Sequence, residues 1–77
     1  MELQKIAQIT GEVLGIDAKD ITPDTEFVKD LGADSLEIFQ IMVGLETQFD
    51  IAIEDKDFQN VVTVKDALRQ IRKLTHG

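Results

Sequence analysis

The segment from Ser35 to Phe49 places the strongest constraint on the fold. It contains no proline, and its apolar residues recur at helical spacing. Asp34 is a favourable N-cap and Glu37 stands three residues later, as in a capping box, so we expect the helix to begin at Ser35. One broad apolar face of this helix has to be covered by other elements. The residues of that face are Ile38, Ile41, Met42, Leu45 and Phe49.

Two further segments carry the helical period. Residues 2–14 hold one apolar stripe, and Gly15 is a natural stop. The last helix follows Thr63, which forms a cap with Asp66, and a short helical piece is expected within residues 55–60. The pattern predicts an all-α fold: a small bundle of three main helices plus one short helix, with a long loop between helices 1 and 2. The core stripe expected in the last helix is Val64, Ala67, Leu68, Ile71 and Leu74.

The long connection, residues 16–32, is rich in turn formers and has to be pinned by its own apolar residues. The anchors expected there are Ile16, Ile21, Phe27 and Leu31. The residues expected to turn inward after the second helix are Ile51, Ile53, Phe58, Val61 and Val62. Gly44 inside the second helix costs roughly 0.5–1 kcal/mol relative to alanine, and close approach of another backbone would account for it.

Length and cysteine content limit how the chain is stabilised. Its 77 residues suffice for a single domain, residues 1–77, and without cysteine it has neither disulfides nor a cysteine-based metal site. Stability must come from helix packing, and any thiol chemistry must use a borrowed thiol. The acids between Asp50 and Asp57 lack the turn glycine and terminal glutamate of an EF-hand, so we expect no metal site.

Charge is distributed unevenly along the chain. Thirteen acids and three bases between Glu12 and Asp57 give −10, whereas residues from Lys65 onward carry +3. The acidic body argues against nucleic acid and favours partner proteins with basic surfaces. Met1 is followed by Glu2 without a signal segment, and no apolar run approaches the ~20 residues of a membrane span. We therefore expect a cytoplasmic, monomeric protein without a membrane span.

Ser35 stands out because Asp34 takes the capping role. Its hydroxyl is then free and points outward at the positive end of the helix dipole, where unpaired N–H groups favour an anion attached to that oxygen. A serine at a helix start is more often simply the cap, but here Asp34 is predicted to be the cap, which argues against that role for Ser35. A hydrolase nucleophile needs a nearby base, and the single histidine, His76, stands next to the C-terminal residue.

Leu36, Phe39 and Val43 form a second apolar strip on the side of Ser35. A bundle helix needs only one stripe, so we expect Phe39 to be buried while Leu36 and Val43 stay partly exposed. An apolar strip rimmed by polar residues beside Ser35 is typical of a docking surface. The partner-binding residues predicted here are Leu36, Glu37, Gln40, Val43, Glu46 and Thr47.

The run from Phe27 to Leu36, together with Leu45-Glu46 and Phe49-Asp50, resembles the acyl carrier proteins of fatty acid synthesis. The resemblance covers nearly the whole chain and agrees with the predicted bundle. It implies that Ser35, flanked by Asp34 and Leu36, carries 4′-phosphopantetheine through a phosphodiester. The thiol of that cofactor would hold acyl chains as thioesters. The chain itself would have no catalytic residue and would be a substrate of a phosphopantetheinyl transferase, with fatty acid synthesis or acyl transfer enzymes as partners.

The resemblance also implies an acyl pocket between the second and third helices. The matching lining is Phe39, Leu45, Ile53, Phe58, Val61 and Leu68. Phe39 and Phe58 are bulkier than the residues often found there, so we expect short acyl chains to enter and long ones to stay partly exposed. The alternative is that both rings simply fill the core of a small domain. Gln40 and Thr47 stand where the family often has acids, which predicts docking that depends less on salt.

Two other functions remain open. The chain can be a carrier for polyketide or peptide synthesis, although carriers for peptide synthetases usually have Gly-His or a similar pair before the serine, and Ala33-Asp34 favours acyl cargo. It can also be an unmodified helical protein-interaction module. Modification of Ser35 distinguishes the carriers from that module.

Overall fold

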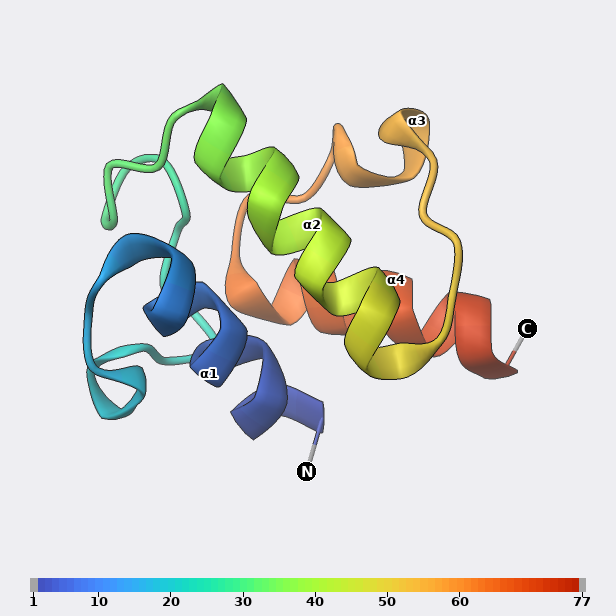
Figure 1. Cartoon of the computed structure of the whole chain (residues 1–77), viewed down its shortest axis with the longest axis horizontal. Helices are drawn as coiled ribbons and strands as arrows, with labels where there is room; N and C mark the ends of the chain where they lie inside the picture. The colour runs from blue at the N-terminus through green and yellow to red at the C-terminus, as the bar shows by residue number, and fades with distance from the viewer. Residues whose placement is uncertain (1, 77) are drawn as a thin grey trace.

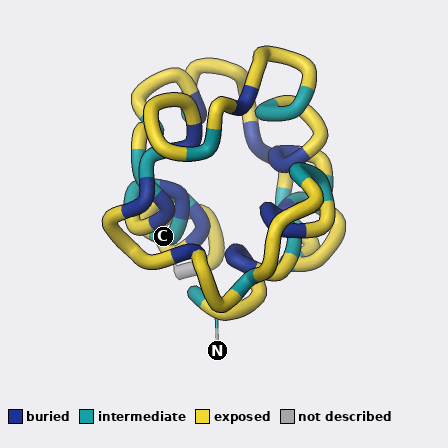
Figure 2. The backbone as a smooth tube through the Cα atoms, turned by 90° about the vertical axis from the view of Figure 1, so that its left-hand side faces the viewer, coloured by how far each residue is buried: buried dark blue, intermediate teal, exposed yellow. Residues whose placement is uncertain are grey.

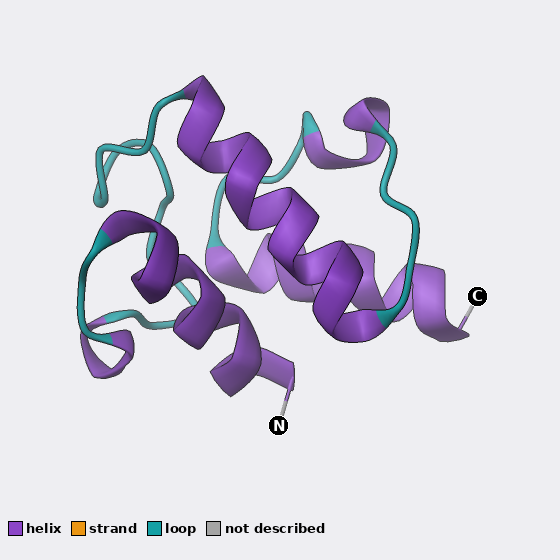
Figure 3. Ribbon diagram, viewed as in Figure 1, coloured by secondary structure: helices purple, strands orange, loops and turns teal. Residues whose placement is uncertain are grey.

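A computed structural model describes residues 2–76, and in this part of the chain four α-helices and one 3₁₀ turn form the fold (Figures 1 and 3). They are α1 (Glu2–Leu14), η1 (Ala18–Asp20), α2 (Ser35–Phe49), α3 (Asp55–Phe58) and α4 (Val64–His76). Among the described residues the one strand-like feature is an isolated antiparallel bridge between Glu26 and Thr63. The predicted all-α bundle of three main helices and one short helix is confirmed.

Helix ends fall where local sequence signals predict them. Gly15, with φ of 72°, follows α1 in the left-handed conformation that glycine adopts without strain. At the start of α4, Thr63 Oγ1 accepts the N–H of Asp66 at 3.2 Å, and Asp66 Oδ2 accepts the N–H of Thr63 at 3.0 Å. Asp50 ends α2 in the left-handed region with φ of 54°. Its N–H donates to the carbonyl oxygen of Glu46.

The core lies where α1 packs against α2 and α4. Dark-blue buried segments of the backbone face one another around the interior in Figure 2. Ile6, Ile41, Leu45 and Ile71 are fully buried, one or two from each long helix. Because these four side chains lie on three different helices, each helix is held through its apolar stripe. Leu74, expected in the stripe of α4, is exposed in its last turn.

Two glycines mark close approaches to α1 and α2. A Cβ on Gly11 would lie 2.5 Å from the carbonyl oxygen of Ile16, so the chain leaving α1 passes against its own helix. A Cβ on Gly44 would lie 2.8 Å from Cγ2 of Ile9. The approach at Gly44 is therefore made by a side chain of α1, and the expectation of another backbone there was wrong.

The first connection, residues 15–34, is tied to the start of α4. Phe27 N–H donates to the carbonyl oxygen of Val62 at 3.1 Å, and Val64 N–H donates to that of Thr25 at 3.0 Å. Lys65 contributes a backbone bond to Pro23 at 3.0 Å and an ion pair to Asp24. Within the connection Ile21 and Phe27 are buried and Leu31 is partly buried, as predicted. Ile16 is 37% exposed, so its predicted role as an anchor was wrong.

The second connection, residues 50–63, contains α3. Ile53 and Phe58 are buried and Ile51 and Val61 are partly buried, as predicted. Val62 is 50% exposed, against the prediction. Val62 belongs to an extended segment that pairs with the first connection. Successive side chains of such a segment point to opposite sides, and Val61 and Thr63 point inward, so Val62 points outward.

No helix within residues 2–76 is long and apolar enough to cross a lipid bilayer. In the same part of the chain, no group of three or more acidic, histidine or cysteine side chains is placed to hold a metal ion.

Candidate functional site

Ser35 is exposed and is the first residue of α2, a helix that starts at its upper end in Figure 1. The capping box is formed as predicted: Asp34 Oδ1 accepts the N–H of Glu37 at 2.8 Å, and Glu37 Oε1 accepts the N–H of Asp34 at 3.0 Å. Among the described residues, neither the hydroxyl of Ser35 nor the N–H groups of Ser35 and Leu36 have a hydrogen-bond partner. A free hydroxyl therefore sits at the positive end of the helix dipole.

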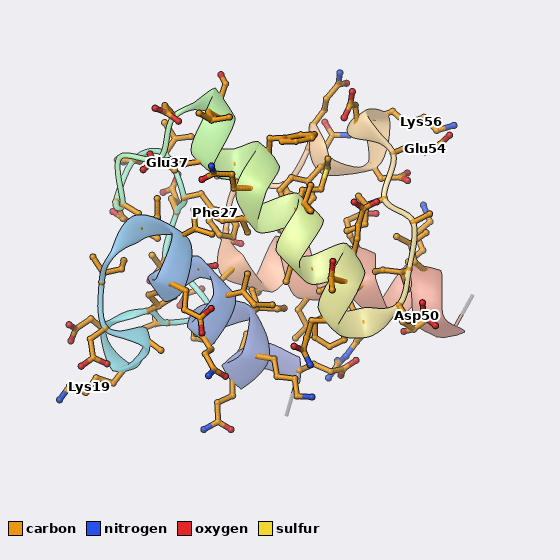
Figure 4. All side chains as sticks on the ribbon, viewed as in Figure 1. Lys19, Phe27, Glu37, Asp50, Glu54 and Lys56 are labelled. Atoms are coloured by element: carbon orange, nitrogen blue, oxygen red, sulfur yellow. The ribbon has the colours of Figure 1, made fainter. Side chains whose placement is uncertain are left out.

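The loop before Ser35 is folded by its own hydrogen bonds. Ala33 is buried and its N–H donates to the carbonyl oxygen of Phe27 at 3.0 Å. Gly32, with φ of 66°, turns the chain, and Asp30 Oδ2 accepts the N–H of Glu26 at 2.8 Å. Phe27, labelled in Figure 4, points into the interior and is 1% exposed. The position of Ser35 is therefore fixed by buried groups on the side of the first connection.

A hollow of about 240 Å³ lies between the first half of α2 and α3, with Ser35 in its wall. We call it the Ser35 hollow, and its lining is Ser35, Ile38, Phe39, Met42, Asp55, Phe58 and Gln59. On α2 the lining follows the helical spacing i, i+3, i+4, i+7 counted from Ser35. The hollow is thus a continuation of the helix face that starts at the serine, and a group attached to Ser35 can lie along it.

Only part of the predicted acyl-pocket lining faces this hollow. Phe39 and Phe58 line it, whereas Leu45 and Ile53 are buried in the core and Leu68 lines a different hollow together with Phe49. Val61 is partly buried outside the Ser35 hollow. The α2 residues that line the hollow lie between Ser35 and Met42, so Leu45, almost one turn further along, is not among them. Counting from Ser35 along the helix would have identified the missed residues Ile38 and Met42.

The apolar strip beside Ser35 is exposed over its whole length. Leu36 is 64%, Phe39 52% and Val43 40% exposed. The predicted exposure of Leu36 and Val43 is confirmed, but the predicted burial of Phe39 was wrong. Phe39 borders the Ser35 hollow, and the single turn of α3 opposite is too short to cover it.

Both carboxylates of the predicted docking surface are engaged by backbone N–H groups. Glu37, labelled at the start of α2 in Figure 4, accepts from Asp34, and Glu46 Oε2 accepts the N–H of Ile53 at 2.7 Å. The hydroxyl of Thr47 donates to the carbonyl oxygen of Val43 at 3.1 Å, and Gln40 is exposed. The surface is therefore apolar along its centre, and its acids already hold internal hydrogen bonds.

Asp66 stabilises the end of the second connection, where that segment pairs with the first. The backbone N–H of Thr63 lowers the pKa of its carboxyl from the ordinary value of 3.8, and the N–H of Val62, the Thr63 hydroxyl and Arg69 act in the same direction against desolvation. Asp66 Oδ2 accepts from both backbone groups, at 3.1 Å from Val62 and 3.0 Å from Thr63. The ionised carboxylate therefore holds the segment that pairs with residues 25–27.

Comparison with known proteins gives consistent matches. The model of the family described as "Phosphopantetheine attachment site" matches residues 4–71. The acyl carrier protein of Solidesulfovibrio magneticus is 40% identical over 91% of this chain and 90% of its own length. That of Desulforapulum autotrophicum is 43% identical over 90% and 91%. The solved structure of a putative acyl carrier protein from Mycobacterium tuberculosis superposes with a TM-score of 0.88 at 37% identity, covering 95% of this chain and 97% of that one.

Proposed function

This chain belongs to the acyl carrier proteins with a phosphopantetheine attachment site, and from that premise we propose that it serves fatty acid synthesis with Ser35 as the attachment residue. Acyl carriage on 4′-phosphopantetheine is the function of the family, with acyl chains and acyl-handling enzymes as partners.

The observation that supports Ser35 is the division of roles at the start of α2. Asp34 supplies the cap, so the exposed Ser35 hydroxyl makes no structural hydrogen bond among the described residues. The free N–H groups of the first turn favour the phosphate of a phosphodiester on that oxygen. Ser35 is also the only serine of the chain. When attached, the group supplies the thiol that a chain without cysteine lacks.

We propose that the chain performs no catalysis of its own. A nucleophilic serine needs a base within hydrogen-bond reach. The carboxylates nearest in sequence, Asp34 and Glu37, are both engaged in the capping box. The C-terminal end of α4, the helix that ends at His76, lies away from the start of α2 in Figure 1. The residues around Ser35 therefore orient and present an attached group.

Modification of the intact protein tests the attachment residue. We expect the unmodified protein, incubated with coenzyme A and a broad-specificity phosphopantetheinyl transferase, to gain one phosphopantetheine mass. The variant Ser35→Ala should gain none. Thr75→Ala removes the hydroxyl of an exposed residue of α4, outside the proposed docking surface, and serves as the matched control that is modified like wild type. No mass gain in wild type, or a gain in Ser35→Ala, would refute the proposal.

Partner enzymes, including the transferase, are proposed to dock on the strip beside Ser35. The surface comprises Leu36, Glu37, Gln40, Val43, Glu46 and Thr47, with Leu36 and Val43 as its exposed apolar centre. Each of its two carboxylates gives one oxygen to an internal hydrogen bond, which leaves fewer acceptor sites for direct pairing, while both charges still attract a basic partner at long range. Exposed ion pairs contribute only about 0.2–1 kcal/mol each.

Binding measurements separate the apolar and ionic contributions. We expect Val43→Ala to weaken binding of the transferase clearly, and a rise in salt to weaken it only modestly. Gln48→Ala, an exposed residue of the same helix outside the proposed surface, is the matched control. A steep loss of affinity with salt, combined with no effect of Val43→Ala, would contradict the proposal.

We further propose that the Ser35 hollow accepts short acyl chains. Its volume of about 240 Å³ is small, and the rings of Phe39 and Phe58 stand in its wall. Of the pocket residues predicted earlier, these two are supported as lining, while Leu45, Ile53, Val61 and Leu68 would be reached only by a chain that displaces packed side chains.

A series of acyl forms examined by NMR tests this size limit. Lengthening the chain should shift the signals of Phe39, Met42 and Phe58 until the hollow is filled, after which the shifts should level off. Shifts that keep growing to the longest chains, and do so equally in Phe58→Ala, would contradict a restricted hollow. A mature cargo typical of polyketide or peptide carriers, found by intact mass of protein from its native host, would favour those pathways.

A further inference from the structure

We propose that Glu46 is a positioning residue that fixes the second connection against α2 and so sets the longest acyl chain that the Ser35 hollow admits. The inference rests on the proposed function of that hollow. It gives the Glu46 carboxylate an internal role in addition to its place on the docking surface. The sequence alone suggested only the surface role.

Glu46 holds the chain just beyond α2 with two different groups. Its carbonyl oxygen accepts the N–H of Asp50 and, at 3.1 Å, that of Ile51. Its carboxylate Oε2 then accepts the N–H of Ile53 at 2.7 Å, in a partly buried position. Hydrogen bonds to an ionised acceptor are stronger than those between neutral groups. A single residue of α2 therefore fixes the path of the connection up to Ile53.

Ile53 lies immediately before α3. The N-terminal cap of α3 is Glu54, whose N–H donates to Asp57 and whose carbonyl oxygen accepts the N–H of Asp57 at 2.9 Å. These bonds stabilise the turn internally and do not attach it to α2. Among the described residues, the bond from Ile53 to Glu46 is the last hydrogen bond between α2 and the chain that follows it.

The position of α3 determines the size of the Ser35 hollow. One wall of the hollow is formed by α2, and the other by Asp55, Phe58 and Gln59 on and after α3. Glu54 and Lys56, labelled in Figure 4, point outward from α3 and pair with each other at 3.3 Å, so they do not brace the turn against α2. Loss of the bond from Ile53 to Glu46 leaves α3 held next to α2 by the packing of the buried Ile53 and Phe58 side chains alone, which lets that wall move outward.

Three variants separate the effect of the hydrogen bond between Ile53 and Glu46 from the effect of a surface charge. Glu46→Ala removes both the charge and the acceptor, whereas Glu46→Gln removes the charge and keeps an amide oxygen that can accept from Ile53. Glu12→Ala removes an exposed acid of α1 that has no hydrogen bond among the described residues, and it is the matched control for charge.

Two readouts are expected to move together. In the unmodified protein, hydrogen exchange at the Ile53 amide should become at least about tenfold faster in Glu46→Ala and stay within about threefold in Glu46→Gln. In the acyl forms, the chain length at which the Phe58 NMR shifts level off should increase in Glu46→Ala. Glu46→Gln and Glu12→Ala should both keep the wild-type length.

Several results would overturn the inference. Unchanged hydrogen exchange at the Ile53 amide in Glu46→Ala would exclude a stabilising bond from Ile53 to Glu46. An unchanged acyl chain length at which the Phe58 shifts level off would exclude control of chain length by that bond. Equal effects of Glu46→Ala and Glu46→Gln on transferase affinity, with exchange and plateau unaffected, would assign Glu46 a docking charge alone. Failure of wild type to be modified at Ser35 would instead overturn the proposed function, and the exchange experiment does not depend on it.

Discussion

The two connections of this molecule are held in opposite ways. The first, residues 15–34, buries Phe27 and pairs through several backbone hydrogen bonds with the end of the second connection and the start of α4. The second, residues 50–63, is attached to α2 through Glu46, and its short helix α3 packs on the rest mainly through Phe58. The first connection carries Ser35, and the second forms the far wall of the Ser35 hollow. The serine is thus fixed, and the adjustable side of the site is the wall opposite.

The largest expected effect comes from Phe27→Ala. Phe27 is 1% exposed and its ring anchors the first connection, so we expect a loss of about 3–5 kcal/mol in the free energy of unfolding. Urea unfolding followed by circular dichroism measures it. A loss below about 1 kcal/mol would mean that the first connection is no more firmly anchored than the second, which would remove the contrast.

Gly11→Ala tests how closely the first connection leaves α1. The added Cβ would meet the carbonyl oxygen of Ile16 at 2.5 Å, and backbone atoms move less readily than side chains. We expect a destabilisation of about 1–3 kcal/mol by the same unfolding measurement. Gly44→Ala is the matched comparison, because the atom it meets is a side-chain methyl group, Cγ2 of Ile9, and not a backbone atom. Equal losses in the two variants would show that the path after α1 can shift.

Asp66→Asn probes the joint between the connections. Near pH 7 we expect the variant to lose about 1 kcal/mol, because a neutral amide accepts the N–H groups of Val62 and Thr63 less strongly. The folded-state pKa of Asp66 lies below its ordinary value of 3.8, so its contribution is complete above that value and is lost as pH falls through the lowered folded-state pKa.

The difference in stability between wild type and Asp66→Asn should therefore shrink as the solution is acidified below pH 3.8. Comparing the two proteins at each pH removes the contribution of the other carboxyls. A difference that stays constant into strong acid would show that the charge of Asp66 does not hold the joint.

The smallest expected effect on stability is that of Phe39→Ala. Phe39 is 52% exposed and faces the second connection across the hollow, so the loss should stay below about 1 kcal/mol. The same variant should enlarge the hollow and raise the acyl length at which the NMR shifts level off. A loss comparable to that of Phe27→Ala would make Phe39 part of the core and would favour the simple packing role of its ring.

The sequence predicted well what neighbouring residues determine. The starts of α2 and α4 follow from reciprocal caps three residues apart, and the end of α1 follows from Gly15. It predicted less well what depends on the path of a connection. The placement of α3 along α2 follows from the left-handed Asp50, and the bond between Glu46 and Ile53 has no counterpart in helical periodicity. The exposure of Phe39 and the set of residues lining the hollow depend on that placement.

The assignment of the cap to Asp34 has a consequence for the life cycle of such a carrier. Because the Ser35 oxygen makes no hydrogen bond among the described residues, the proposed attachment would convert its hydroxyl to a phosphodiester without removing a hydrogen bond from the fold. Attachment and removal of a prosthetic group are then independent of folding. With attachment at Ser35 as proposed, the chain would fold before it is modified and would keep the same internal hydrogen bonds when the group is removed.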